Sequence, residues 1–247
     1  MATKSDVLAL SNGMEFMHVP AGKFIMGSNN GNQEEKPQHT VDIPYGYWMA
    51  RYLLTNEQYN MYLKANGAPH PDLNLEKKKE HPVVNVTWDA VIEYCQWLNS
   101  LLNTKLPSGV VLRLPTEAEW EKAARGTDGR EFPWGNTFDK NKCNSSEGEK
   151  GETTSVGLYS PHGDSPYGCA DMAGNVWEWT HSEDKAYPYN AKDGREDEQK
   201  YAFRVIRSGN YHHEARRMRC AVRQNYHPRY GYETLGFRIC LAPPLPE

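Results

Sequence analysis

The sequence predicts one α+β domain. Its 247 residues are enough for one large domain, and a chain of this size hides roughly 70–75% of its unfolded surface. Helical periodicity is confined to the first half, whereas polar loops with short extended pieces dominate beyond residue 127. No linker and no internal repeat divides the chain, so we expect residues 1–247 to fold as a single unit.

The first part of the chain favours strands. Residues 14–27 alternate apolar and polar side chains around Pro20-Ala21-Gly22, which predicts a β-hairpin. Residues 40–53 predict another strand after a polar loop. Thr55 is then a candidate N-cap for a helix over 56–65.

The strongest helix signal lies at residues 88–103. An apolar stripe recurs there at helical spacing, and it consists of Trp88, Val91, Ile92, Cys95, Leu98, Leu101 and Leu102. A short strand is expected at 110–114. Thr116 and Glu119 then have the spacing of a capping box that opens another helix, and Gly126 is its expected left-handed end.

The second half offers few regular elements. Short extended pieces are expected at 175–180, 203–209 and 235–241, whereas 139–166 and 183–200 are polar or charged loops. A region of this kind needs metal ions or a dense hydrogen-bond network to order it.

The five cysteines do not suggest a disulfide framework or a four-cysteine zinc site. Their number is odd and no pair has CxxC spacing; they are Cys95, Cys143, Cys169, Cys220 and Cys240. No apolar run approaches the length of a membrane span, and the first residues lack the order of a secretory signal. We therefore expect reduced thiols, no membrane insertion and a cytoplasmic location.

The net charge of −4 hides a basic tract. Residues 204–238 contain eight Arg, no Lys and only Glu214 and Glu233 as acids. Such a tract can bind nucleic acid or an acidic ligand. Arginine interleaved with Tyr and His is better suited to specific, partly buried contacts, and some of these Arg can pair with acids elsewhere in the chain. Nucleic-acid binding is therefore the less favoured interpretation.

Several motifs carry a resemblance over roughly 14–241. They are VPAGKFIMGS, HPVVNVTWDAVIEYCQWLN, RLPTEAEWEKAARG, FPWGN, GCADMAGNVWEWT, RVIRSGNY and LGFRIC. In these motifs the chain resembles the formylglycine-generating enzyme (sulfatase-modifying factor) family, a branch of the C-type-lectin-like folds. The resemblance implies a compact α+β domain with little regular structure, commonly ordered by calcium.

That family does not have a single function. It includes copper-dependent oxidases that turn a substrate cysteine into formylglycine, iron-dependent sulfoxide-forming relatives, and non-catalytic binding proteins. Some of the binding proteins are variable proteins of diversity-generating retroelements, and this chain is closest to them in pattern. The fold alone does not choose among these activities.

The residues needed for oxidation are absent from their expected place. The copper oxidases carry two cysteines just after a GGS-like turn, because thiolates select Cu(I). Here Ser208-Gly209-Asn210 is followed by residues 211–219 without a cysteine, and Cys220 lies beyond. Without two thiolates there we expect no copper. His212 and His213 are adjacent, and because neighbours on a strand point to opposite faces, they are poorly placed to share one metal ion. A formylglycine-generating-type metal-dependent oxidase acting on a cysteine or thiol substrate, with an altered site, remains the alternative.

Calcium is the better metal prediction, because hard cations prefer carboxylate and carbonyl oxygens. By resemblance, two side chains and two main-chain carbonyls of one loop would hold a structural calcium ion. The side chains are Asp171 and Glu178, and the carbonyls belong to Gly174 and Val176. A second family site would begin near Asn144 and Ser145, where this chain is shorter than the oxidases.

The C-terminal segment 204–238 carries the functional prediction. From residue 211 onward it is crowded with aromatic and polar side chains, which resembles a retroelement-diversified segment, although Glu214, Gln224 and Glu233 fall outside the repertoire of adenine mutation. Tyr gives large contact area at little entropic cost and Arg gives directional hydrogen bonds. We predict a non-catalytic protein that binds a protein or other macromolecular ligand. The predicted contact residues are Tyr211, His212, His213, Arg216, Arg217, Gln224, Tyr226, His227, Tyr230 and Tyr232.

Overall fold

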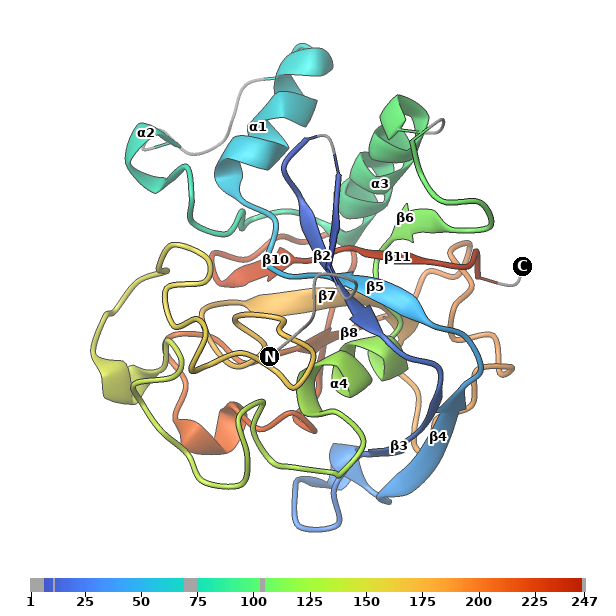
Figure 1. Ribbon diagram of the computed structural model, residues 1–247, viewed down its shortest axis with the longest axis vertical. Coiled ribbons are helices and arrows are strands. Elements are labelled where there is room, and N and C mark those ends of the chain that lie inside the picture. The colour runs from blue at the N-terminus through green and yellow to red at the C-terminus, as the bar shows by residue number, and fades with distance from the viewer. Residues whose placement is uncertain (1–6, 11, 69–74, 103–104, 246–247) are drawn as a thin grey trace.

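The computed structural model describes residues 7–10, 12–68, 75–102 and 105–245. Two larger sheets, one two-stranded sheet and four helices are connected by long loops (Figure 1). The helices are α1 (Asn56–Ala65), α2 (Leu75–Lys78), α3 (Trp88–Leu102) and α4 (Glu117–Arg125). Within the described part of the chain, no helix is both long and apolar enough to span a bilayer.

The first sheet is antiparallel and has the order β1-β2-β5-β11-β6. It brings the two ends of the described chain together, because its strands are β1 (Val7–Ala9), β2 (Glu15–Val19), β5 (Tyr47–Ala50), β11 (Cys240–Ala242) and β6 (Val111–Arg113). The second sheet has the order β10-β7-β8-β9, with one parallel pair between β10 and β7. Its strands are β7 (Trp177–Glu183), β8 (Arg204–Arg207), β9 (Gln224–Tyr226) and β10 (Leu235–Phe237).

The predicted hairpin at 14–27 is wrong. Both of its strands form, but β2 pairs with β1 and β5, whereas β3 (Gly22–Met26) pairs with β4 (His39–Ile43). The predicted strand 40–53 is likewise two strands, β4 and β5, which belong to different sheets. Apolar partners distant in sequence override the local turn signal around Pro20.

The helix predictions are confirmed to within two residues. Thr55 and Thr116 each cap a helix, and each makes a complete capping box, with Gln58 and Glu119 respectively. The helix that Thr116 opens ends at Gly126, whose φ of 72° lies in the left-handed region. The local cap signals therefore place these helix ends correctly.

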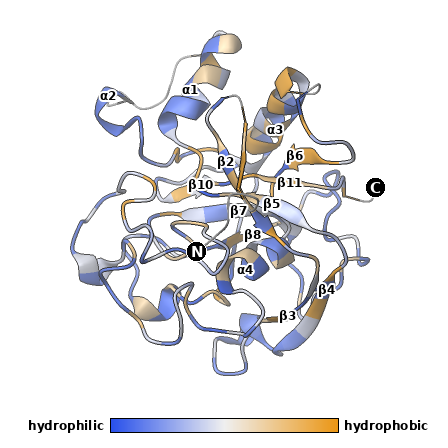
Figure 2. Cartoon of the chain, in the orientation of Figure 1, coloured by the Kyte–Doolittle hydropathy of each residue, from blue (hydrophilic) through white to orange (hydrophobic). Residues whose placement is uncertain are grey.

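Helix α4 is buried although its sequence is polar. All nine of its residues are buried, and Figure 2 shows a mainly hydrophilic helix in the middle of the molecule. It packs against β3, β7 and β8. A polar helix can occupy a core only if its charges find partners there, and those partners come from the C-terminal tract.

Candidate binding surface

Most of the arginine tract faces inward. Arg207 contacts Glu117 and Glu121 at 2.7 and 2.8 Å, and Arg223 contacts Glu117 at 2.6 Å. Two further members pair elsewhere: Arg219 with Glu35, and Arg238 with Glu178. Arg204 is buried as well, with its guanidinium 4.0 Å from the ring centroid of Trp88. Of the eight arginines of this tract, Arg216 and Arg229 are exposed and Arg217 is half-buried, which leaves little of the exposed positive charge that nucleic acid would need.

Aromatic side chains gather on the surface around β9. Tyr201, Phe203, Tyr230 and Tyr232 are 64, 52, 62 and 49% exposed. His227 joins them, because its ring lies 5.2 Å from Tyr201, 5.6 Å from Phe203 and 4.7 Å from Tyr230. Tyr226, which directly precedes His227 in the chain, lies 6.1 Å from Tyr232. We call these six residues the aromatic patch.

A rigid platform supports the aromatic patch. Tyr226 packs on the buried Trp179, with ring centroids 6.0 Å apart. The amide of Trp88 donates to the carbonyl of Pro228 at 2.8 Å, and the amide of Asn85 donates to that of Tyr232 at 3.0 Å. Gly231 lies so close to Asn85 that an added Cβ would stand 2.5 Å from its backbone carbon. The loop that carries Tyr230 and Tyr232 is therefore fixed by main-chain contacts.

The predicted contact residues fall into two neighbouring groups. Gln224, Tyr226, His227, Tyr230 and Tyr232 lie in or beside the aromatic patch. The others, Tyr211, His212, His213, Arg216 and Arg217, lie along a loop that follows β8 and are half-buried or exposed.

The loop at 211–217 borders the patch. The side-chain amide of Asn210, just before this loop, donates to Oγ1 of Thr234 at 2.8 Å, which ties the start of this loop to the segment that carries Tyr232. The His213 ring lies 5.4 Å from that of Trp177, and its Nδ1 is buried without a hydrogen-bond partner among the described residues.

Two patch residues were missed by the sequence analysis. Tyr201 and Phe203 come from the end of the charged loop before β8, and the Tyr201 hydroxyl lies 2.7 Å from Nε2 of His227. The guanidinium of Arg229 lies 4.7 Å from the Tyr201 ring centroid. The sequence did carry one signal for these residues, because two aromatic side chains flank Ala202 at the end of a polar loop.

No reactive thiol lies at this surface. All five cysteines are buried and free. Burial raises the pKa of Cys220, the cysteine nearest to the 208–210 turn in sequence, to about 12. A buried thiol with a raised pKa is a poor nucleophile and a poor metal ligand at neutral pH.

The predicted calcium loop has other partners. Both carboxylate oxygens of Glu178 accept hydrogen bonds from Arg238, at 2.7 and 2.8 Å, and one also accepts from Trp120. The Gly174 carbonyl accepts from Ser208 at 3.1 Å, and Asp171 accepts from the amide of Gly157. As arranged here, Glu178 does not fit a cation.

The neighbouring loop fits a hard cation better. Within the described part of the chain, Asn144 Oδ1 and Thr154 Oγ1 are buried without a hydrogen-bond partner, and both residues contact Asn175. Across residues 7–10, 12–68, 75–102 and 105–245, no three His, Cys, Asp or Glu side chains are grouped to hold a metal. Any ion here would therefore depend on amide, hydroxyl and carbonyl oxygens, so calcium binding stays a prediction.

Calcium is expected to raise the melting temperature through the site near Asn144. Binding to the folded state alone contributes about 2.7 kcal/mol at a hundred times the Kd. Thermal unfolding with calcium and with a chelator measures the shift. The calcium-induced rise in melting temperature should disappear in Asn144→Ala and persist in Glu178→Gln. The reverse pattern would place the ion in the Asp171–Glu178 loop instead.

Comparison with known proteins agrees with this architecture. The family profile of the sulfatase-modifying factor enzyme 1-like domain matches residues 5–243. The formylglycine-generating enzyme of Mus musculus is 34% identical over 302 aligned positions, covering 92% of this chain and 75% of the enzyme. Serine/threonine-protein kinase pkn1 of Chlamydia pneumoniae is 30% identical over 91% of this chain, which spans only 37% of that relative's length.

Two solved structures share the fold. PvdO from Pseudomonas aeruginosa superposes with a TM-score of 0.79 at 24% identity, covering 98% of this chain and 99% of PvdO. Treponema denticola variable protein 1 superposes with a TM-score of 0.74 at 23% identity, covering 96 and 98% of the two chains. The predicted α+β, C-type-lectin-like fold is confirmed.

Proposed function

The chain belongs to the sulfatase-modifying factor enzyme 1-like family, and within that family we propose that it is a non-catalytic protein that binds a macromolecular ligand, with a protein as the favoured partner. The aromatic patch carries this proposal. Tyr is enriched at the centres of protein interfaces, because one ring supplies a large contact area with few rotatable bonds. Four large side chains about half or more exposed, Tyr201, Phe203, Tyr230 and Tyr232, would be costly to leave in water without a partner.

The backbone beneath the patch supports binding rather than turnover. The contacts of Pro228, Gly231 and Tyr232 with Asn85 and Trp88 preorganise the surface, which lowers the entropic cost of association. The same platform would tolerate different side chains at the exposed positions between its fixed points. This is the property that a retroelement-diversified surface needs.

Removing three exposed rings tests the proposal. Peptides selected from a displayed random library on the wild-type protein should lose at least about 30-fold in affinity for a Tyr201→Ala/Tyr230→Ala/Tyr232→Ala variant, because one interface hot spot is worth about 2 kcal/mol. The matched control replaces three exposed apolar residues elsewhere, Met61, Leu101 and Leu158, which are 47, 57 and 55% exposed. Both variants should unfold at similar temperatures. Equal binding by both variants, or no selected peptide, would contradict the proposal.

An oxidase that acts on a cysteine or thiol substrate is the alternative. Similarity to the mouse formylglycine-generating enzyme favours it, whereas the cysteine-free stretch at 211–219 and the buried Cys220 oppose it. Oxygen consumption with a cysteine peptide and added copper or iron would establish turnover, and loss of that turnover in a Cys220→Ser variant would place a thiol in the reaction.

A further inference from the structure

A cavity of about 630 Å³ has none of the aromatic patch residues in its walls. Helix α3, strand β6, the start of the C-terminal tail and the loop after β7 form its walls. Its volume lies within the range of small-molecule sites. None of the predicted ligand or calcium residues lines it, so an explanation of this cavity goes beyond the proposed function.

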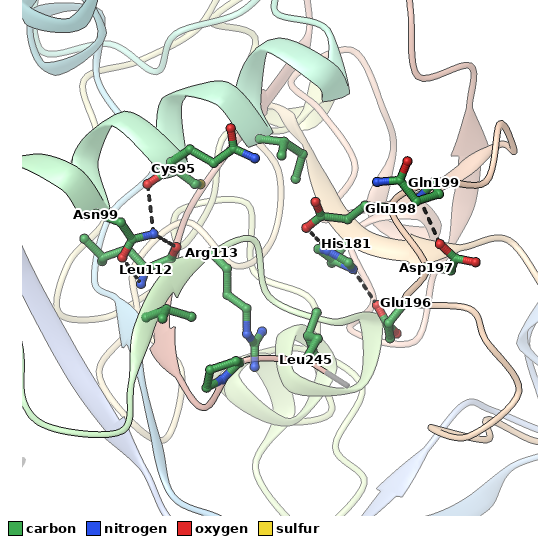
Figure 3. A pocket seen from close by; sticks show the side chains of 14 residues that line it. Cys95, Asn99, Leu112, Arg113, His181, Glu196, Asp197, Glu198, Gln199 and Leu245 are labelled. Atoms are coloured by element: carbon green, nitrogen blue, oxygen red, sulfur yellow. Dashed lines mark hydrogen bonds and ion pairs between the residues drawn. The ribbon is translucent and has the colours of Figure 1, made fainter. Parts of the chain in front are cut away.

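The two sides of the cavity differ in chemistry. Figure 3 shows His181, Glu196 and Glu198 on one side, with Asn99, Leu112 and Arg113 facing them. The second side is largely apolar, and Ile92, Val111, Pro244 and Leu245 extend it. A ligand that fits both sides needs a polar end and an apolar body.

Two polar side chains on the apolar side, Asn99 and Arg113, are already satisfied. Asn99 exchanges hydrogen bonds with both main-chain groups of Leu112, at 2.6 and 2.9 Å. Arg113 is paired with the buried Glu119 at 2.8 Å, which cancels its charge. Neither residue has charge to offer an anionic ligand.

The opposite side keeps unused acceptor capacity. Both ring nitrogens of His181 lie 2.9 Å from a carboxylate oxygen, one of Glu196 and one of Glu198. Since a neutral imidazole has a single N–H, both hydrogen bonds require the imidazolium. Burial opposes that charge, but the bonds to Glu196 and Glu198 raise the pKa of His181 above its usual value.

Among the described residues, one carboxylate oxygen on this side, Oε2 of Glu198, is left without a partner. Glu196 is also held by Ser182 and Tyr189. In the part of the chain that the structure describes, Glu198 accepts a hydrogen bond only through Oε1, from His181, and this bond lowers the pKa of Glu198. The Glu198 side chain is 44% exposed. Asp197 adds a third carboxylate and lies 3.8 Å from the exposed Lys200. Arg204 donates to the carbonyls of Asp197 and Lys200.

We infer that this cavity is a binding site for an organic cation, a primary ammonium group on an apolar body. The ammonium would take Oε2 of Glu198 as acceptor beside Asp197, and the apolar body would lie against Leu112 and Leu245. His181, Lys200 and Arg204 balance the three carboxylates, so it is the free carboxylate oxygen of Glu198, an acceptor with no donor of its own to offer, that favours a cationic donor over an anion of the same shape. The bridge through His181 fixes the carboxylates in place before the ligand arrives.

The first test compares three probes of similar shape, of which one is cationic, one neutral and one anionic. Calorimetric titration with 2-phenylethylammonium should give saturable binding, at least about tenfold tighter than 2-phenylethanol or 3-phenylpropanoate, because a hydrogen bond to a charged group is worth that factor or more. Side-chain amide resonances of Gln96 and Asn99 should shift on titration. Equal binding of the three probes, or none, would overturn the inference.

Two variants locate the site. Glu198→Gln keeps an acceptor for His181 and removes the charge, so it should weaken the ammonium probe about tenfold. Gln96→Trp places a large ring from the exposed face of α3 into the cavity and should abolish binding. The matched controls are Glu57→Gln and Ser100→Trp, at exposed positions outside the cavity, and both should bind as the wild type does. A loss of binding in either control would overturn the assignment, whereas peptide binding by the aromatic patch should be unchanged in all four.

Discussion

Replacing Glu117 by Gln is expected to lower the free energy of unfolding by at least about 3–5 kcal/mol, the cost of removing one partner of a buried charge pair. Glu117 is fully buried at the start of α4 and accepts from Arg207 at 2.7 Å, Arg223 at 2.6 Å and Tyr187 at 3.0 Å. Arg195, also fully buried, lies 3.8 Å away. A neutral amide would leave these guanidinium groups with too little negative charge inside the core.

The pKa of Glu117 supports this expectation. Burial favours the protonated form, yet Arg223 and Arg207 hold the pKa of this carboxyl below its usual value. The carboxylate is therefore the form that the fold requires at neutral pH.

Urea unfolding with a matched surface variant measures the effect. Glu152→Gln removes an ion pair with Lys78 at 3.0 Å, in which the Glu152 side chain is 62% exposed. Exposed pairs contribute only about 0–1 kcal/mol, so this control should unfold close to the wild type. Comparable losses in the two variants would show that the network around Glu117 contributes little to stability.

The helices could be predicted from the sequence because their signals are local. Thr116, Glu119 and Gly126 define the ends of α4 and lie close together in the sequence. Strand pairing depends on partners that are far apart in sequence. The turn at Pro20 resembles a hairpin turn, but Met17 pairs with Met49 and Phe24 pairs with Val41.

The candidate site could be predicted only in part, for the same reason. The exposed Tyr230 and Tyr232 follow from a segment whose composition the scaffold does not explain. Their neighbour Tyr201 joins them only through the fold, across a loop with no helical or strand period. The inward direction of Arg207 depends on the position of α4, which is distant in sequence.

Replacing Arg238 by Met is expected to destabilise the protein by about 3–5 kcal/mol, because it leaves the buried carboxylate of Glu178 without its positively charged partner. Both side chains are fully buried, and Trp120, which donates to Glu178 at 2.9 Å, would be its only remaining side-chain partner among the described residues. The double variant Arg238→Met/Glu178→Gln removes both charges and should recover part of the loss. A double-mutant cycle in urea measures that coupling.

Adding calcium to the same unfolding experiments tests whether the Asp171–Glu178 loop can take a cation. In Arg238→Met the Glu178 carboxylate lacks its guanidinium partner, so a cation that enters the Asp171–Glu178 loop would replace the lost charge. Calcium should then stabilise Arg238→Met more than the wild type and should have no such additional effect on the double variant. Equal calcium shifts in all three proteins would mean that the Asp171–Glu178 loop takes no calcium ion even when Arg238 is removed. The polar core would then be ordered at this point by an ion pair rather than by a metal.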